Sequence, residues 1–293
     1  LADELTDESL YCYIKNGRKY IMLYDFFKAE DYISRRLSIM KECSYDNKID
    51  FSDVIDIAEK NSGVEYAELQ RKAINLALSY GFLVITGGPG TGKTTTLNAI
   101  IKIMKANGKT VLLSAPTGRA AQRMSELTGD EAKTLHRLLE VSWDKHDNPV
   151  FNKNERNQLK CDALIVDEVS MVDTFIMESV MRALSTGCRL ILVGDSDQLP
   201  SVGPGNVLGD LIESGLIPVV RLNEIFLQAQ QSLIVTNAHK IVNGEIPILN
   251  SADKDFFFLQ RNNKSEVSAV IADLCANRLP KAYGYSPFEN IQV

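Results

Sequence analysis

Cysteine pairs, long apolar runs and an excess of basic charge are all missing from this sequence. Its five cysteines are far apart and none forms a CxxC pair, so the sequence predicts neither a disulfide framework nor a zinc site. No apolar run approaches the roughly 18 residues of a membrane span, and acids interrupt the first thirty residues, where a signal peptide would be apolar. We therefore expect a cytoplasmic protein with reduced thiols and no membrane partner.

The formal net charge of −6 argues against a surface that binds polyanions everywhere. A local basic groove would still be enough to hold a few nucleotides. The content of 45% hydrophobic and 24% charged residues is that of an ordinary globular protein, and 293 residues suffice for one main domain with smaller attachments.

Four short apolar runs follow one another after residue 81, with helical patterns between several of them. They are FLVIT (82–86), TVLLSA (110–115), ALIVDE (163–168) and RLILVGD (189–195). Fully apolar strands separated by helices are typical of a parallel sheet covered on both faces. The sequence therefore predicts an α/β fold.

Two other stretches differ from this pattern. Residues 1–62 have apolar positions at helical spacing and predict a small helical accessory domain that ends at an Asn-Ser-Gly sequence. The polar segment 141–160 has Asp-Asn-Pro at 147–149 between two strand-like pieces, which predicts an inserted hairpin. The chain starts without methionine and stops in a strand-like run, ENIQV, and we interpret it as a fragment.

The segment GGPGTGKT (87–94) fits the pattern G-x-x-x-x-G-K-[ST] and stands between an apolar run and a helical pattern. Glycines let such a loop point its backbone N–H groups at phosphate oxygens, and Lys93 would reach the β and γ phosphates while Thr94 binds Mg²⁺. A glycine-rich turn with a surface lysine is the alternative. The predicted ATP-binding residues are Gly88, Pro89, Gly90, Thr91, Gly92, Lys93, Thr94 and Thr95.

Two further apolar runs end in polar residues. LIVDE (164–168) predicts that Asp167 binds Mg²⁺ and that Glu168 is the general base for the attacking water. The alternative is an acidic helix cap after a strand. In VGDSDQLP (193–200), Gln198 would lie beside the nucleotide, because ligands of open parallel sheets bind at the carboxyl ends of strands. A plain loop is the alternative there.

Together these segments resemble the RecD/TraA family of superfamily 1 DNA helicases, which includes exodeoxyribonuclease V alpha subunits. GGPGTGKTTT, SAPTGRAAQRMSE, TLHRLL, LIVDEVSMVD, LVGDSDQLPSVGPGNVLGDL and RLNEIF occur in the family's order, over about three quarters of the chain. The resemblance implies a RecA-like ATPase domain over 63–225 and a truncated start of a second one over 226–293. It implies ATP-driven movement 5′ to 3′ along single-stranded DNA, an adenine contact at Gln70, and coupling of nucleotide to DNA through Gln198.

The resemblance also implies contacts to single-stranded DNA. The residues concerned are Pro116, Thr117, Gly118, Arg119, Thr134, His136, Ser201 and Asn206. Arg119 and Arg123 could equally form the solvated face of a helix, and His136 could be a core histidine. In the family the insertion splits the duplex at a junction, and Trp143 would either stack on a base or pack under the hairpin.

One departure from the family pattern concerns hydrolysis. After RLNEIF the family has an arginine that touches the γ-phosphate, whereas this chain has Leu227. Such an arginine can raise the rate by about 10³ to 10⁵, so we expect weak hydrolysis and little unwinding by this chain alone. A regulatory or structural nucleotide-binding subunit and a P-loop kinase are the alternatives. Partner subunits of a recombination nuclease are expected from the resemblance alone.

Overall fold

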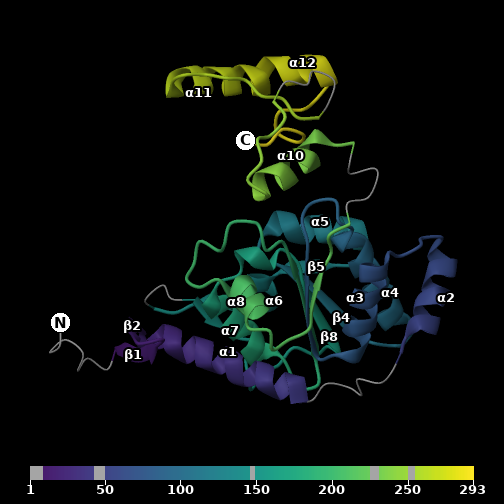
Figure 1. The fold of residues 1–293 in the computed structure, drawn as a ribbon, viewed down its shortest axis with the longest axis vertical. Helices are drawn as coiled ribbons and strands as arrows, with labels where there is room; N and C mark the ends of the chain where they lie inside the picture. The colour runs from purple at the N-terminus through teal and green to yellow at the C-terminus, as the bar shows by residue number, and fades with distance from the viewer. Residues whose placement is uncertain (1–8, 43–49, 146–148, 225–230, 250–254) are drawn as a thin grey trace. The chain divides into compact units, whose positions relative to one another are not determined.

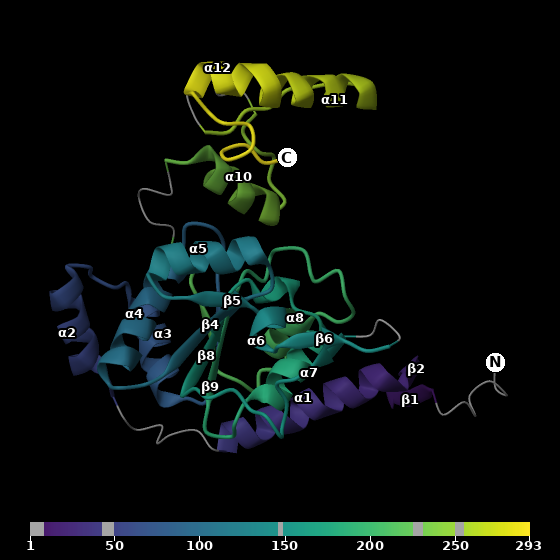
Figure 2. The ribbon, with the colours of Figure 1, turned by 180° about the vertical axis from the view of Figure 1, so that it is seen from behind.

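The computed structural model describes residues 9–42, 50–145, 149–224, 231–249 and 255–293. The chain divides into two compact units, residues 1–230 and 231–293. Figures 1 and 2 show the elements of each unit.

A six-stranded parallel sheet forms the centre of the first unit, in the order β10-β3-β9-β8-β4-β5. Its strands are β3 (Phe82–Thr86), β4 (Val111–Ala115), β5 (Ala132–Thr134), β8 (Ala163–Val166), β9 (Arg189–Gly194) and β10 (Val219–Arg221). The four predicted apolar runs form β3, β4, β8 and β9, so the α/β prediction is confirmed. The two edge strands, β5 and β10, have three residues each and were not predicted.

Helices cover both faces of this sheet (Figures 1 and 2). The helices that bury side chains in the core on one face are α1 (Tyr24–Glu42), α6 (Leu135–Leu138), α7 (Thr174–Ala183) and α8 (Val207–Glu213). Those on the other face are α2 (Ser52–Ser62), α3 (Glu68–Ser79), α4 (Lys93–Ala106) and α5 (Gly118–Thr128).

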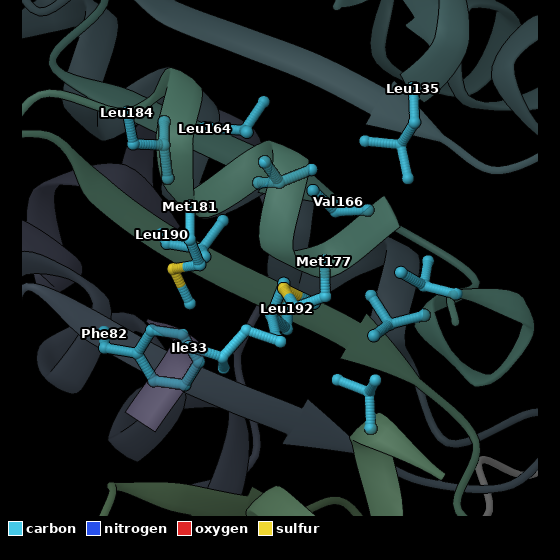
Figure 3. Close-up of a cluster of buried hydrophobic side chains, with 14 of the residues drawn as sticks. Ile33, Phe82, Leu135, Leu164, Val166, Met177, Met181, Leu184, Leu190 and Leu192 are labelled. Carbon is cyan, nitrogen blue, oxygen red and sulfur yellow. The ribbon is translucent and has the colours of Figure 1, made fainter. Parts of the chain in front are cut away.

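Alternation along each strand separates the two cores. In β3, Phe82 and Val84 pack in one cluster while Leu83 and Ile85 pack in the other, because successive side chains of a strand point to opposite faces. Figure 3 shows the first cluster, in which Ile33 of α1 lies near Phe82 and the side chains of α7. Burial of each large aliphatic side chain contributes about 1.5–3 kcal/mol, so these clusters hold the sheet and helices together.

The N-terminal residues differ from the sequence prediction. Residues 10–23 form an antiparallel hairpin of β1 (Leu10–Lys15) and β2 (Arg18–Leu23), so the prediction of helix is wrong there. The turn Asn16-Gly17 has positive φ at both residues, as tight hairpin turns require. An Asn-Gly pair between apolar runs is a hairpin signal that the helical reading overlooked.

The predicted boundary between residues 62 and 63 stays a prediction. Ile33 and Met40 of α1 are buried in the same cluster as α7, and residues 1–230 form one compact unit. The predicted boundary between residues 225 and 226 lies outside the described residues. The inserted hairpin is confirmed: β6 (Val141–Trp143) pairs antiparallel with β7 (Pro149–Phe151), although positions 147 and 148 of the predicted turn are not described.

The second unit contains α10 (Leu233–Val242), α11 (Lys264–Asp273), the π-helical turn η3 (Leu274–Arg278) and α12 (Leu279–Tyr283). In α10, the buried side chain of Asn237 exchanges two hydrogen bonds with the backbone of Ile248, at 2.9 and 2.7 Å. Among the described residues of the whole chain, no helix has the length and apolarity needed to cross a membrane.

Candidate nucleotide and DNA site

The glycine-rich loop lies between β3 and α4, where the sequence pattern places it. Gly90 and Gly92 have φ values of 76° and 79°, a region that L side chains rarely adopt. Gly87 packs against β10, since a Cβ built there would lie 2.5 Å from the Leu222 carbonyl oxygen. Glycine is therefore favoured at all three positions, and phosphate binding by this loop stays a prediction.

Lys93 begins α4 and folds back over the loop. Its Nζ donates hydrogen bonds to the carbonyl oxygens of Gly87 at 2.5 Å and Gly88 at 2.9 Å. Burial lowers the pKa of Lys93, and three nearby carboxylates oppose this effect: those of Asp195, Asp167 and Glu168. Lys93 is half-buried, and its role in neutralising phosphate charge stays a prediction.

The other loop residues have distinct environments. Thr91 is buried and its hydroxyl donates to the Gly88 carbonyl at 2.8 Å, which fixes the curvature of the loop. Pro89 and Gly90 are exposed at the tip. In the first turn of α4, Thr94 is half-buried and Thr95 is exposed. The backbone N–H groups of this turn point toward the loop, because helix N–H groups point to the N-terminus.

Gln70 joins the helix before β3 to the loop. Only 2% of its side chain is exposed. Its Oε1 accepts from the Ala67 amide at 3.0 Å, and its Nε2 donates to the Gly92 carbonyl at 3.3 Å. Each of these atoms retains one further hydrogen-bonding position, and the contact of Gln70 to adenine stays a prediction.

Asp167 and Glu168 follow β8 directly. The Asp167 amide donates to the Ser114 carbonyl of β4 at 3.0 Å, and the Glu168 amide donates to Asp167 Oδ1 at 2.9 Å. Burial raises the pKa of both carboxyls, and the charge of Asp167 raises that of Glu168 further. Glu168 has φ 54°, an uncommon conformation for a non-glycine residue that is often found at functional sites. Both residues are half-buried, and their roles in Mg²⁺ binding and catalysis stay predictions.

Asp195 follows β9 and was not selected from the sequence. It is 5% exposed, and its charge acts on Lys93 and Glu168. The signal was present, since Asp195 is the first polar residue after an apolar strand. Gln198, which was selected, is exposed and accepts a hydrogen bond from the Ser170 hydroxyl at 3.2 Å. Ser170 comes two residues after Glu168, so this bond connects the loops that follow β8 and β9.

The loop after β9 is also fastened to the start of α7. The Thr174 amide donates to the Pro204 carbonyl at 3.0 Å. A Cβ added at Gly203 would overlap Asp173 Oδ2, and one at Gly205 would overlap Thr174 Oγ1. The backbone of the loop after β9 therefore packs directly against the start of α7 at both glycines.

Two residues predicted to bind DNA have structural partners in this loop. The hydroxyl of Ser201 donates to the carbonyls of Gly203 and Gly205, and the side chain of Asn206 caps α8 by accepting from the Gly209 amide at 3.3 Å. Both side chains therefore shape the loop. Any contact of theirs to DNA stays a prediction.

The remaining DNA candidates follow β4 and β5. Thr117 caps α5 and Thr134 caps α6, each by accepting a backbone amide at 3.2 Å. Pro116 precedes α5, and Gly118 and Arg119 are exposed in its first turn. His136 is exposed and 6.0 Å from the Phe151 ring, so the alternative of a core histidine is wrong.

Arg123 and Trp143 had two interpretations each. Arg123 is exposed on α5, yet its charge acts on Lys93, Asp167 and Glu168, so it is part of the electrostatic surroundings of the site. Trp143 is 65% exposed on β6, so packing under the hairpin is wrong. Leu227 lies outside the described residues.

Most of these residues lie in the loops that follow parallel strands or in the first turn of the helix after such a loop. The loop 87–92 follows β3, residues 116–119 follow β4, residues 167 and 168 follow β8, and residues 195–206 follow β9. The carboxyl ends of parallel strands lie at one edge of a sheet, where ligands of such folds bind. The half-buried oxygen groups there, the Thr94 hydroxyl and the Asp167 carboxylate, suit Mg²⁺, which prefers hard oxygen ligands.

Comparison with known proteins agrees with this geometry. The family model described as an AAA domain matches residues 70–204. The ATP-dependent RecD2 DNA helicase of Deinococcus radiodurans is 39% identical over 181 residues, which are 62% of this chain and 24% of that protein. The RecBCD enzyme subunit RecD of Buchnera aphidicola subsp. Acyrthosiphon pisum is 34% identical over 316 aligned positions, covering 89% of this chain and 52% of that protein.

The chain thus spans between about a quarter and about a half of the length of these two relatives. A solved structure of Bacteroides sp. Pif1 with ADP-AlF4 has a TM-score of 0.48 and 23% identity, over 73% of this chain and 58% of that one. Fold and site define a P-loop ATPase domain of the RecA-like type. The chain belongs to the RecD family of superfamily 1 helicases.

Proposed function

We propose that this chain carries the ATP-dependent motor core of a DNA helicase that moves 5′ to 3′ along single-stranded DNA. One observation supports the proposal most: Lys93, Asp167 and Glu168 act on one another electrostatically at the carboxyl edge of the sheet. This is the set of groups that phosphoryl transfer from ATP to water needs. The direction of movement rests on the family resemblance alone.

The residues would divide the work as follows. The loop 87–92 and Lys93 bind the phosphates, and Gln70 binds adenine. Glu168, which burial makes more basic, accepts a proton from the attacking water. Thr94 and Asp167 would hold Mg²⁺, whose charge neutralises the phosphate oxygens.

The DNA-binding part of the proposal rests on the loops beside this site. Exposed Arg119, hydroxyl groups and glycine-rich backbone can hold phosphates without reading sequence. Gln198 and Ser170 connect the loop of Glu168 to the loop 200–206. We infer that this connection couples the presence of the γ-phosphate to the grip on DNA. Duplex junctions and the subunits of a recombination nuclease are further proposed partners.

A second candidate function is a regulatory or structural nucleotide-binding subunit. Leu227, in place of the family's arginine, favours it. With that arginine missing, weak hydrolysis and little unwinding by this chain alone are part of the main proposal.

The test is ATP hydrolysis by this chain and by the full-length parent, with and without a single-stranded oligonucleotide, at several Mg²⁺ concentrations. We expect DNA to stimulate the parent, and Glu168→Gln to lower its rate about 10²- to 10⁴-fold while ATP still binds. Glu213→Gln, an exposed carboxyl at the end of α8, is the matched control. An unstimulated parent would favour the structural nucleotide site.

A further inference from the structure

Two cysteine thiols lie in contact at the amino edge of the sheet, opposite the ATP site. Cys161 precedes β8 and Cys188 precedes β9, and their Sγ atoms are 3.3 Å apart. The strands are direct neighbours, with Ala163 paired to Arg189. A disulfide has an S–S distance of about 2.05 Å, so the two sulfur atoms need to approach by only about 1.2 Å.

The backbone on each side of the pair is firmly held. The Asp162 amide donates to the Thr110 carbonyl at 2.9 Å, and the Asp162 carboxylate accepts from the Thr110 amide at 2.8 Å. The Asp162 carbonyl accepts from the Arg189 amide at 2.9 Å, and the Cys188 amide donates to the Ser185 carbonyl at 3.1 Å. The closeness of the sulfur atoms therefore follows from the sheet and not from a loose loop.

From this juxtaposition we propose that Cys161 and Cys188 form a site of reversible oxidation that closes to an intramolecular disulfide. Cys161 is half-buried and open to a small reagent, whereas Cys188 is only 1% exposed. The bond would cross-link the amino ends of the two strands whose carboxyl ends bear Asp167 and Asp195.

The oxidant is a low-molecular-weight disulfide such as oxidised glutathione. The Cys161 thiolate attacks one sulfur of the reagent, forming a mixed disulfide and releasing one thiolate. Cys188 loses its proton and attacks the Cys161 sulfur, which forms the protein disulfide and releases the second thiolate. The protein loses two electrons and two protons, and one reagent disulfide becomes two thiols.

The hydrogen bond between the thiols assigns these roles. It lowers the pKa of Cys161, whereas the same bond and burial raise the pKa of Cys188. The first attack thus comes from the more exposed and more acidic sulfur. The exposed Cys12 and the half-buried Cys275 have no thiol partner among the described residues, so they serve as internal references for simple mixed-disulfide formation.

Peptide mapping under non-reducing conditions tests the proposal. The native protein is incubated with oxidised glutathione, its free thiols are alkylated, and it is denatured and digested with trypsin. Cleavage after Lys160, Arg182 and Arg189 gives the peptides 161–182 and 183–189, which stay joined only through the proposed bond. We expect the joined pair, and we expect dithiothreitol to separate it.

The variants make the outcome decisive. In Cys188→Ala, Cys161 should accumulate the glutathione adduct that the native chain resolves, and in Cys161→Ser neither adduct nor joined peptide should form. The oxidised native chain should melt roughly 5–15 °C higher, because a cross-link of this loop length restricts the unfolded chain, and Cys161→Ser should show no such shift. Two outcomes in the native chain would overturn the proposal while Cys12 and Cys275 acquire glutathione. In the first, Cys161 stays free, and in the second, Cys161 keeps the glutathione adduct and no joined peptide forms.

Discussion

Gln70 has two roles that a single substitution can separate. Its side chain supports the glycine-rich loop through hydrogen bonds to the Ala67 amide and the Gly92 carbonyl. We also propose that it binds adenine through its remaining N–H and lone pair, as a carboxamide can bind N7 and the 6-amino group together. Gln70→Ala removes both roles.

The magnitudes follow from these contacts. Each buried hydrogen bond contributes about 0.5–1.5 kcal/mol, so Gln70→Ala should destabilise the first unit by about 1–3 kcal/mol and lower its melting temperature by roughly 2–12 °C. A bidentate base contact is worth about 1–3 kcal/mol of discrimination. ATP affinity should therefore fall about 5- to 150-fold more than GTP affinity, whose smaller loss reports only the missing support of the loop.

Isothermal titration with ATP and GTP, together with thermal unfolding, measures both effects. Gln122→Ala, which removes an exposed amide on α5 that bonds to Glu126, is the control and should leave both unchanged. An equal loss of ATP and GTP affinity would refute the adenine role and leave Gln70 as a support for the loop.

Three further predictions concern hydrolysis, the loop after β9 and stability. Leu227→Arg should raise the DNA-stimulated ATPase rate of the full-length parent. Leu227→Lys should raise it less, because lysine lacks the planar guanidinium. An unchanged rate with arginine would show that Leu227 does not limit hydrolysis. Gly203→Ala should weaken binding of a fluorescent oligonucleotide several-fold, because the added methyl group strains the loop by roughly 1–2 kcal/mol. Gly187 has open space around it, so Gly187→Ala should leave binding unchanged. Equal effects of the two substitutions would contradict the packing argument. Arg182→Gln should lower the free energy of unfolding in urea by about 1–3 kcal/mol, because this partly exposed guanidinium lies 3.9 Å from the Tyr32 ring and pairs with Glu155 and Glu178. Substitution of the exposed Arg156 by Gln is the control. An equal loss of stability there would contradict the stacking argument.

The sequence was sufficient wherever one local rule decided the structure. Buried strands are unbroken apolar runs, and the loop pattern has glycines at fixed spacing, so the sequence predicts both β3 and the glycine-rich loop that follows it. The hairpin of β1 and β2 is harder to predict, because apolar residues such as Tyr13 and Ile21 fit a helical spacing as well as a strand, and only the turn Asn16-Gly17 favours the hairpin.

Long-range packing was harder to foresee. The burial of Asp195 depends on how β9 ends beside Lys93, and the position of Arg123 depends on the orientation of α5 relative to β8. Nor could the sequence show that α1 packs on α7, because the contacting residues are about 150 positions apart, as in the hydrogen bond from Arg36 to the Leu184 carbonyl at 2.8 Å.

The two glycines that touch the start of α7 have a mechanical consequence. Gly203 and Gly205 leave no space between the loop after β9 and the first turn of that helix. The hydroxyl of Ser170, which lies between β8 and α7, donates a hydrogen bond to Gln198 of the loop after β9. These contacts join the loops that follow β8 and β9, so we expect the two loops to move together. In the proposed function, a small movement of the loop after β8 would therefore shift the backbone of residues 200–206, where we propose that DNA binds.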